Sequence, residues 1–306
     1  MKINKIGKKL EASAIGLGCM RIGSMAPAAA SKLVQTALAS GINLFDHADI
    51  YGAGQAETVF GRAVREAKIP REDIVVQTKC GIRKGFFDFS KEHIMTSLEN
   101  SLKRLQMDYV DMLLLHRPDT LMEPEEVAEA FTLLRKSGKV RYFGVSNHNT
   151  AQIRLLSKYL EGENSIIANQ LQFSPTNTGM IDAGLNVNMQ NPHSIDRDGS
   201  VLEFCRLEDI TIQAWSPFQY GFFVGAFLGS NMYPALNKKI NTFAAEKNIS
   251  PEAVVMAWIL RHPAKMQPMP GTTNLERIKG LTKAYDIEMT REQWYGIYCS
   301  AGNVLP

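Results

Sequence analysis

Three apolar runs of this sequence end in side chains that can exchange protons. Runs 42–46, 74–79 and 110–116 end in Asp46, Lys79 and His116, and Tyr51 follows shortly after the first of them. If the runs are neighbouring parallel strands, these four side chains gather at one end of a sheet. A phenol beside an ammonium, with a carboxylate to hold the ammonium and an imidazole nearby, is suited to donating a proton to a carbonyl oxygen. The residues therefore predict a reductase.

The predicted roles follow from the chemistry of each group. Tyr51 is the general acid, although a free phenol has a pKa near ~10. The ammonium of Lys79 is expected to favour the phenolate and so to lower that pKa. Asp46 would keep Lys79 charged and in place. His116 would orient the substrate oxygen or assist the proton transfer.

Each of these four residues also has a purely structural interpretation. Tyr51 could pack at the start of a helix, and Asp46 could cap one. Lys79 could be a solvated strand end, and His116 a hydrogen-bonded core histidine. Their joint placement at three strand ends favours the catalytic interpretation.

The composition predicts a globular, cytoplasmic protein. The chain has 306 residues, is 45% hydrophobic and carries a formal net charge of +3, without a basic run that would indicate nucleic-acid binding. Its four cysteines lie far apart, which indicates reduced thiols rather than zinc ligands or disulfides. No His/Cys cluster predicts a metal site. The first residues lack the apolar core of a signal peptide, and no stretch has the ~20 apolar residues of a membrane span.

Short apolar runs alternate with helix-like segments along the whole chain. The pattern predicts an α/β fold, a (β/α)8 TIM barrel that forms a single domain over residues 1–306. A doubly wound sheet is the competitor, but the first strand is not followed by GxGxxG. The first dozen residues should form a hairpin that plugs the barrel, and 290–301 an extra C-terminal helix. The expected strands are 14–18, 42–46, 74–79, 110–116, 140–146, 166–171, 210–215 and 266–270, and the expected helices are 28–40, 55–68, 91–106, 124–137, 150–160, 235–262 and 274–284.

Two long loops, 172–200 and 217–234, follow predicted strands and should lie on the catalytic face. The first is rich in Asn and Gly, and the second in aromatic residues and Gly. Together with Met20, Phe86 and Phe87, the aromatic loop predicts an apolar pocket that prefers aromatic or medium-chain carbonyls to sugars.

Proton donation to a carbonyl requires a hydride source, so the sequence should also hold a cofactor. Trp215 could stack on a nicotinamide, and the polar residues Ser146, Asn147 and Gln170 could bind its carboxamide. The segment 270–274 opens a helix, where backbone N–H groups favour a phosphate. Arg277 could bind a 2′-phosphate. A core tryptophan and an exposed helical arginine remain the structural alternatives.

These residues together make the chain resemble the aldo-keto reductase superfamily over nearly its whole length. The resemblance implies a TIM barrel that binds NADPH and reduces a small-molecule aldehyde or ketone to an alcohol. It implies that Asp46, Tyr51, Lys79 and His116 are catalytic. The matching pieces, in family order, are Gly16-Leu17-Gly18 with Met20, Phe45-Asp46-His47-Ala48-Asp49-Ile50-Tyr51-Gly52, Thr78-Lys79, Leu115-His116, Gly144-Val145-Ser146-Asn147, Asn169-Gln170, Trp215-Ser216-Pro217 and Pro270-Gly271-Thr272-Thr273 with Arg277. The cofactor-binding residues that the resemblance implies are Met20, Asp46, Ser146, Asn147, Gln170, Trp215, Ser216, Phe218, Gly221, Gly271, Thr272, Thr273 and Arg277.

The chain departs from the family pattern at three positions. Gly271 stands where a lysine commonly binds the 2′-phosphate, Leu281 replaces an adenine-contacting asparagine, and His47 replaces a frequent threonine. These changes bear on the strength and selectivity of NADPH binding. The Asn-rich loop resembles the branch of general bacterial oxidoreductases.

Two other functions are compatible with the sequence. Some relatives of this superfamily are β subunits of ion channels, so the chain could be a cofactor-binding regulatory protein. Alternatively, a barrel lyase or isomerase could use Lys79 to form a Schiff base. The oligomeric state is left open by the sequence.

Overall fold

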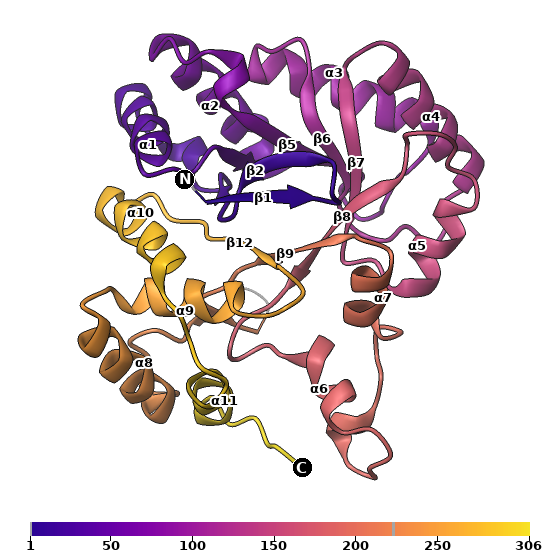
Figure 1. The fold of residues 1–306 in the computed structure, drawn as a ribbon. Coiled ribbons are helices and arrows are strands. Elements are labelled where there is room, and N and C mark those ends of the chain that lie inside the picture. The colour runs from indigo at the N-terminus through magenta and orange to yellow at the C-terminus, as the bar shows by residue number, and fades with distance from the viewer. Residues whose placement is uncertain (1, 222–223) are drawn as a thin grey trace.

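A computed structural model of the chain describes residues 2–221 and 224–306. Its centre is a barrel of parallel strands surrounded by helices (Figure 1). The strands are β3 (Leu17–Gly18), β4 (Leu44–Asp46), β5 (Val75–Cys80), β6 (Val110–Leu115), β7 (Val140–Ser146), β8 (Ile166–Gln172), β9 (Thr211–Trp215) and β12 (Gln267–Met269). They pair in this order, and hydrogen bonds of 3.0 Å from Gly16 N to Pro268 O and from Gly18 N to Pro270 O close the ring. The predicted TIM barrel is confirmed in place of a doubly wound sheet.

The strands are apolar because both of their faces are covered. Every residue of β6 is buried. Leu113 and Leu115 belong to the large cluster that includes the surrounding helices, whereas Met112 and Leu114 belong to a smaller cluster inside the barrel. This alternation is the period of two expected of a strand, and burial on both sides explains the unbroken apolar run in the sequence.

The helices largely follow the expected ranges, and one long prediction was wrong. The segment 235–262 forms two helices, because Asn248 ends the first with φ 52° and Pro251 begins the second. The helices are α1 (Pro27–Ala39), α2 (Gln55–Glu66), α3 (Lys91–Leu105), α4 (Pro124–Lys136), α5 (Thr150–Ser157), α6 (Gly179–Leu185), α7 (Val201–Leu207), α8 (Pro234–Lys247), α9 (Pro251–Leu260), α10 (Leu275–Leu281) and α11 (Arg291–Ser300).

The N-terminal hairpin plugs one end of the barrel, as predicted. Strands β1 (Ile3–Ile6) and β2 (Leu10–Ser13) pair antiparallel, and Ile6 and Leu10 join the interior cluster. The turn approaches the barrel so closely that a Cβ on Gly7 would lie 2.4 Å from the Cβ of Ile167. Gly7 also has φ 55°, so this position requires glycine.

The extra C-terminal helix α11 is likewise present. Thr290 and Gln293 form a capping box at its start. Trp294 on α11 stacks on Trp258 of α9 with ring centroids 4.7 Å apart. Each indole donates a hydrogen bond to the other residue's carbonyl oxygen, at 2.9 and 3.0 Å.

Both long loops contain regular structure that the sequence did not predict. The segment 172–200 includes α6, and Tyr298 of α11 donates a 2.8 Å hydrogen bond to Asp182 on that helix. Helix α7 follows it and has only seven residues, too few to show a period in the sequence. In the segment 217–234, β10 (Gln219–Tyr220) and β11 (Gly225–Ala226) pair antiparallel. Phe222 and Phe223, part of the predicted aromatic pocket, lie outside the described residues.

Candidate active site

The barrel brings the four residues at the strand ends together. Asp46 ends β4, Lys79 lies near the end of β5, and His116 directly follows β6. Strands β4, β5 and β6 are neighbours in the sheet, with parallel pairing throughout. Tyr51 begins a short 3-10 turn, Tyr51–Gly54, that leads into α2. All four therefore lie at the carboxyl ends of the strands, which is the catalytic face of TIM barrels.

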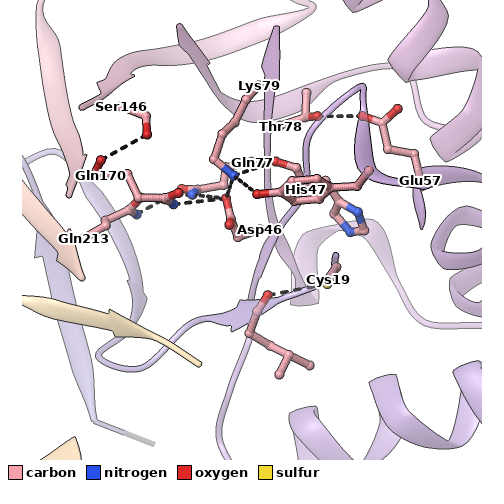
Figure 2. A network of polar contacts seen from close by, with 12 residues as sticks. Cys19, Asp46, His47, Glu57, Gln77, Thr78, Lys79, Ser146, Gln170 and Gln213 are labelled. Carbon is pink, nitrogen blue, oxygen red and sulfur yellow. Dashed lines mark hydrogen bonds and ion pairs between the residues drawn. The ribbon is translucent and has the colours of Figure 1, made fainter. Parts of the chain in front are cut away.

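Lys79 makes the central contacts of this group. Its ammonium donates hydrogen bonds to Asp46 Oδ1 at 2.6 Å, to the His47 carbonyl oxygen at 2.9 Å and to the Tyr51 hydroxyl at 3.2 Å. Lys79 is fully buried and Asp46 is 4% exposed. Figure 2 shows the Lys79 side chain reaching Asp46 and the His47 backbone. Burial alone would lower the pKa of Lys79, but Asp46 and the Tyr51 hydroxyl more than offset it, so the pKa lies above its ordinary value and Lys79 stays charged.

Lys79 was predicted to bring the pKa of Tyr51 below its ordinary value. This prediction was wrong, because the pKa that results from all contributions is raised. Burial of the phenol raises the pKa of Tyr51, and the Lys79 ammonium offsets only part of that rise. The negative charge of Asp46 adds to the rise. Tyr51 is thus protonated at neutral pH, which is the form a general acid must start from.

His116 is a neutral imidazole at the same end of the barrel. Its ring packs edge-on against Tyr51, with centroids 5.9 Å apart. Burial, followed by the charges of Lys79 and Arg117, holds the pKa of His116 well below its usual range. Its Nδ1 atom is buried without a hydrogen-bond partner in the part of the chain that the structure describes. His116 also lines the cavity at this end of the barrel, where a ligand can contact its ring.

These residues open onto a cavity of about 510 Å³ that runs between the strand ends and the following loops. Lys79 is not on its wall but contacts Asp46 and Tyr51, which are. Gly221 and Thr273, which were expected in the cofactor site, are not on its wall, and neither are the exposed Phe86 and Phe87. The expected residues that do line it are Met20, Asp46, Tyr51, His116, Ser146, Asn147, Gln170, Trp215, Ser216, Phe218, Gly271, Thr272 and Arg277.

The expected carboxamide-binding residues form a connected series. Trp215 Nε1 donates to Asn147 Oδ1 at 3.1 Å, Asn147 Nδ2 donates to Ser146 Oγ at 2.7 Å, and Ser146 Oγ donates to the Gln170 carbonyl oxygen at 3.0 Å. Asn147 and Ser216 both have positive φ, 59° and 49°. Such strained backbone is typical of functional sites, where the surrounding structure enforces it.

Arg277, on the cavity wall, already has a partner. Its Nε atom lies 3.0 Å from Glu252 Oε1, and both residues line the cavity. The backbone N–H of Arg277 donates to Asn274 Oδ1 at 3.0 Å, which caps α10. A phosphate bound at this helix start would therefore compete with the Glu252 carboxylate for the Arg277 guanidinium.

Several residues of the site were missed from the sequence. Glu252, Arg21 and Arg117 line the cavity. Gln77 and Gln213 lie buried beside Asp46. The sequence did contain a signal for the two glutamines. Gln77 lies two positions before Lys79 and Gln213 two positions before Trp215, so each shares a strand face with a predicted functional residue.

Neither a metal centre nor a membrane segment is evident in the described residues. No group of three or more His, Cys, Asp or Glu side chains is placed to hold a metal ion within 2–221 and 224–306. Across the same residues, no helix combines the length and apolar character needed to cross a membrane.

Comparisons with known proteins show which family and which fold this chain shares. The model of the aldo/keto reductase family matches residues 14–298. The uncharacterised oxidoreductase YcsN of Bacillus subtilis is 37% identical over 280 residues, 87% of this chain and 86% of the relative. The 6-dehydroglucose reductase of Agrobacterium fabrum is 34% identical over 309 residues, 97% of this chain and 96% of the relative. A solved thermostable aldo-keto reductase shares the fold with a TM-score of 0.80, at 24% identity, and the match covers 98% of this chain and all of that one.

Proposed function

Because this chain belongs to the aldo/keto reductase family, we propose that it reduces an aldehyde or ketone to the alcohol with NADPH. The contact that carries the proposal is the 3.2 Å hydrogen bond from a buried lysine to the hydroxyl of Tyr51 at the cavity wall. Tyr51 donates its proton to the carbonyl oxygen, and the Lys79 ammonium stabilises the phenolate that remains. Asp46 holds that ammonium, and His116 orients the carbonyl.

The residues along the cavity fit NADPH by their chemistry. Ser146, Asn147 and Gln170 would bind a carboxamide, and Trp215 offers an aromatic face beside them. Ser216 and Phe218, which line the cavity, would hold the pyrophosphate. Bound NADPH supplies the hydride for the carbonyl carbon. A solved aldo-keto reductase from Klebsiella pneumoniae, with a TM-score of 0.75 to this chain, is in complex with NADPH.

A panel of aldehydes and ketones with the purified protein tests the activity by loss of NADPH absorbance. We expect turnover of simple aldehydes. Tight NADPH binding without turnover of any carbonyl compound would favour the regulatory interpretation instead. Reductive trapping of a substrate on Lys79 by borohydride would favour the Schiff-base interpretation.

We further propose that the substrate is a hydroxylated carbonyl compound derived from a sugar. The expected preference for aromatic carbonyls relied on Met20, Phe86, Phe87 and the aromatic loop; Met20, Phe218 and Leu228 line the cavity, whereas Phe86 and Phe87 do not. Beside these apolar residues, the wall carries hydrogen-bonding side chains from Arg21, Arg117 and Gln219. Two relatives, 34% and 31% identical to this chain, are named 6-dehydroglucose reductase.

In the same panel, a sugar-derived aldehyde should exceed benzaldehyde in kcat/KM by at least about tenfold. A site built to hydrogen-bond hydroxyl groups discriminates strongly against substrates that lack them. Equal or higher kcat/KM for benzaldehyde would contradict this proposal and leave the reductase activity itself intact.

The choice of cofactor is proposed to depend on Arg277 and Glu252. A charge-assisted hydrogen bond to phosphate contributes roughly 1.5–3 kcal/mol, and Arg277→Ala at this exposed position should raise the Kd of NADPH by about tenfold. The Kd of NADH, which lacks the 2′-phosphate, should hardly change. Glu252 competes for the guanidinium and repels a phosphate, so Glu252→Gln should tighten NADPH binding several-fold.

Titration of both cofactors by quenching of tryptophan fluorescence measures these changes. Lys279→Ala is the matched control, because Lys279 is an exposed cation on the same helix, is paired with Glu276 and is not on the cavity wall. Equal weakening of NADPH and NADH by Arg277→Ala would show that Arg277 does not recognise the phosphate.

A further inference from the structure

The interior of the barrel contains four glutamines where apolar side chains would ordinarily pack. They are Gln77 on β5, Gln170 on β8, Gln213 on β9 and Gln267 on β12. Gln170 is 3% exposed and the other three are fully buried. Gln213 is in register with Gln170 on one neighbouring strand and with Gln267 on the other. We call these four side chains the glutamine layer; Gln170 is on the cavity wall and the other three are not.

Hydrogen bonds join the four amides to the catalytic carboxylate. Gln77 Nε2 donates to Asp46 Oδ1 at 2.5 Å, and Gln170 Nε2 donates to the same oxygen at 3.2 Å. Gln77 and Gln213 also bond each other reciprocally through Nε2 and Oε1, with both distances 2.9 Å. Figure 2 shows Gln170 and Gln213 beside Asp46, with Lys79 reaching the same carboxylate.

The series continues away from the cavity to the hairpin plug. Gln213 Nε2 donates to Gln267 Oε1 at 2.9 Å, and Gln267 Nε2 donates to the Ser13 carbonyl oxygen at 2.7 Å. Ser13 is the last residue of β2. The amide series thus connects Asp46 at the catalytic end to the backbone that closes the opposite end.

Both ends of the series can only accept hydrogen bonds, and this dictates how the amides are oriented. A carboxylate requires that Gln77 present its NH2 group, and a backbone carbonyl requires the same of Gln267. The reciprocal pair of Gln77 and Gln213 then fits only one arrangement. None of the polar atoms of these four described side chains is left buried without a partner. A fully connected buried network of this kind specifies a single geometry, whereas a partly connected one would be costly.

We propose that Gln77 and Gln213 are positioning residues that hold Asp46 and Gln170 rigidly, and thereby fix the Lys79 ammonium at the Tyr51 hydroxyl. The inference rests on the proposed reductase function. Asp46 Oδ1 receives three hydrogen bonds, from Gln77, Gln170 and Lys79. Without the amides, the Asp46 carboxylate could rotate. The Lys79 ammonium would then no longer be held within hydrogen-bond distance of the Tyr51 hydroxyl.

The same network decides what Gln170 can offer a ligand. Both hydrogens of its NH2 group have acceptors, Asp46 Oδ1 and Gln213 Oε1 at 3.2 Å. Gln170 therefore presents its side-chain carbonyl oxygen to the cavity, and this atom is an acceptor for the NH2 group of a carboxamide. The network selects this orientation before any ligand binds.

The first test is Gln77→Met, which keeps the length of the side chain and removes its donor. We expect kcat to fall about tenfold, as loss of one charge-assisted hydrogen bond would give. KM for the carbonyl and the Kd of NADPH should change less than about twofold, because Gln77 is not on the cavity wall. A folded Gln77→Met protein with wild-type kcat would overturn the proposal.

The second variant, Gln77→Glu, adds a readout that general loss of packing would not produce. A carboxylate at this position cannot donate to Asp46 and repels it. Burial and the neighbouring negative charge raise the pKa of the introduced carboxyl group, so that below this pKa it carries a proton and can donate again. The kcat deficit relative to wild type at each pH should therefore shrink as the pH falls. A deficit that is constant over the whole pH range would contradict the proposal.

The matched control is Gln267→Met, which removes an equally buried amide of the same series that does not touch Asp46. Its Tm should fall as much as that of Gln77→Met, while kcat stays within about threefold of wild type, since Gln213 keeps its bonds to Gln77. If Gln77→Met does not fold, Gln77→Glu carries the test alone, through the difference between its kcat deficit at high pH, where the carboxylate cannot donate, and at low pH, where the carboxyl group can. Absence of turnover in the wild type would count against the reductase function, whereas equal kcat in wild type and all variants would count against the positioning role alone.

Discussion

Replacing Tyr51 by phenylalanine should lower kcat for carbonyl reduction by about 10²–10⁴-fold, the usual contribution of a positioned general acid. The variant removes one hydroxyl group from a ring that otherwise keeps its contact with His116. The Kd of NADPH should be nearly unchanged, because the hydroxyl acts on the oxygen of the substrate. Single-turnover measurements with NADPH would separate this loss in the chemical step from any change in product release.

The control for this prediction is Tyr285→Phe. Its hydroxyl accepts a 3.3 Å hydrogen bond from Ile15 N and does not line the cavity. Burial raises the pKa of Tyr285 to about 12, so this phenol resembles Tyr51 in being protonated and partly enclosed. Wild-type kcat in Tyr285→Phe and a large loss in Tyr51→Phe would locate the proton donor. Near wild-type single-turnover rates in Tyr51→Phe would remove Tyr51 from that role.

The pH dependence of the wild-type enzyme should follow from the same group. Since burial keeps the pKa of Tyr51 above its ordinary value, the phenol remains a proton donor throughout the neutral range. The rate of reduction should therefore decline only at strongly alkaline pH, as the phenol loses its proton. Tyr51→Phe should lack this alkaline decline, because no phenol is left to titrate.

The second large effect is expected for Lys79→Met, with a loss in kcat of at least about 100-fold. Burial disfavours the phenolate form of Tyr51, and the variant would lack the ammonium that partly offsets this cost. The variant should also lose stability, by about 3–5 kcal/mol, because Asp46 would remain as a buried charge without its partner.

A double variant separates these two consequences. Lys79→Met combined with Asp46→Asn removes both charges, so Tm should recover part of the way toward wild type while kcat stays low. Differential scanning calorimetry and initial rates on the same preparations measure the two effects. Recovery of kcat together with Tm would mean that the cation stabilises the fold and contributes nothing to proton transfer.

The position of the proposed catalytic residues could be inferred from the sequence, because they occupy the ends of strands whose order follows the order of the chain. Consecutive parallel strands in a barrel are neighbours, so Asp46, Lys79 and His116 had to meet. The hairpin plug and the C-terminal helix were visible for a similar reason. Turn residues and capping residues act over a few positions, and these local signals persist whatever the rest of the chain does.

The sequence could not decide how residues distant along the chain share partners. Arg277 is attractive as a phosphate ligand when read alone, but its side chain lies 3.0 Å from Glu252, a residue on another helix. Phe86 and Phe87 suggested an aromatic pocket, but they are exposed to solvent in the loop between β5 and α3. Whether Lys79 lowers the pKa of Tyr51 below its ordinary value depends on the balance between charge and burial, and burial is set only by the assembled barrel.

The glutamine layer shows this division most clearly. Alternation along each strand places Gln77 on the face of Lys79 and Gln213 on the face of Trp215, and this much is determined by the local period of two. The contact between Gln77 and Gln213 joins residues 136 positions apart on strands that are not neighbours in the sheet. Only closure of the barrel brings those side chains across its interior to within hydrogen-bond distance. The sequence by itself thus determined which residues face inward at the catalytic end. The tertiary structure decided which of them form hydrogen bonds with one another, because these partners depend on distances across the barrel that no local sequence pattern encodes.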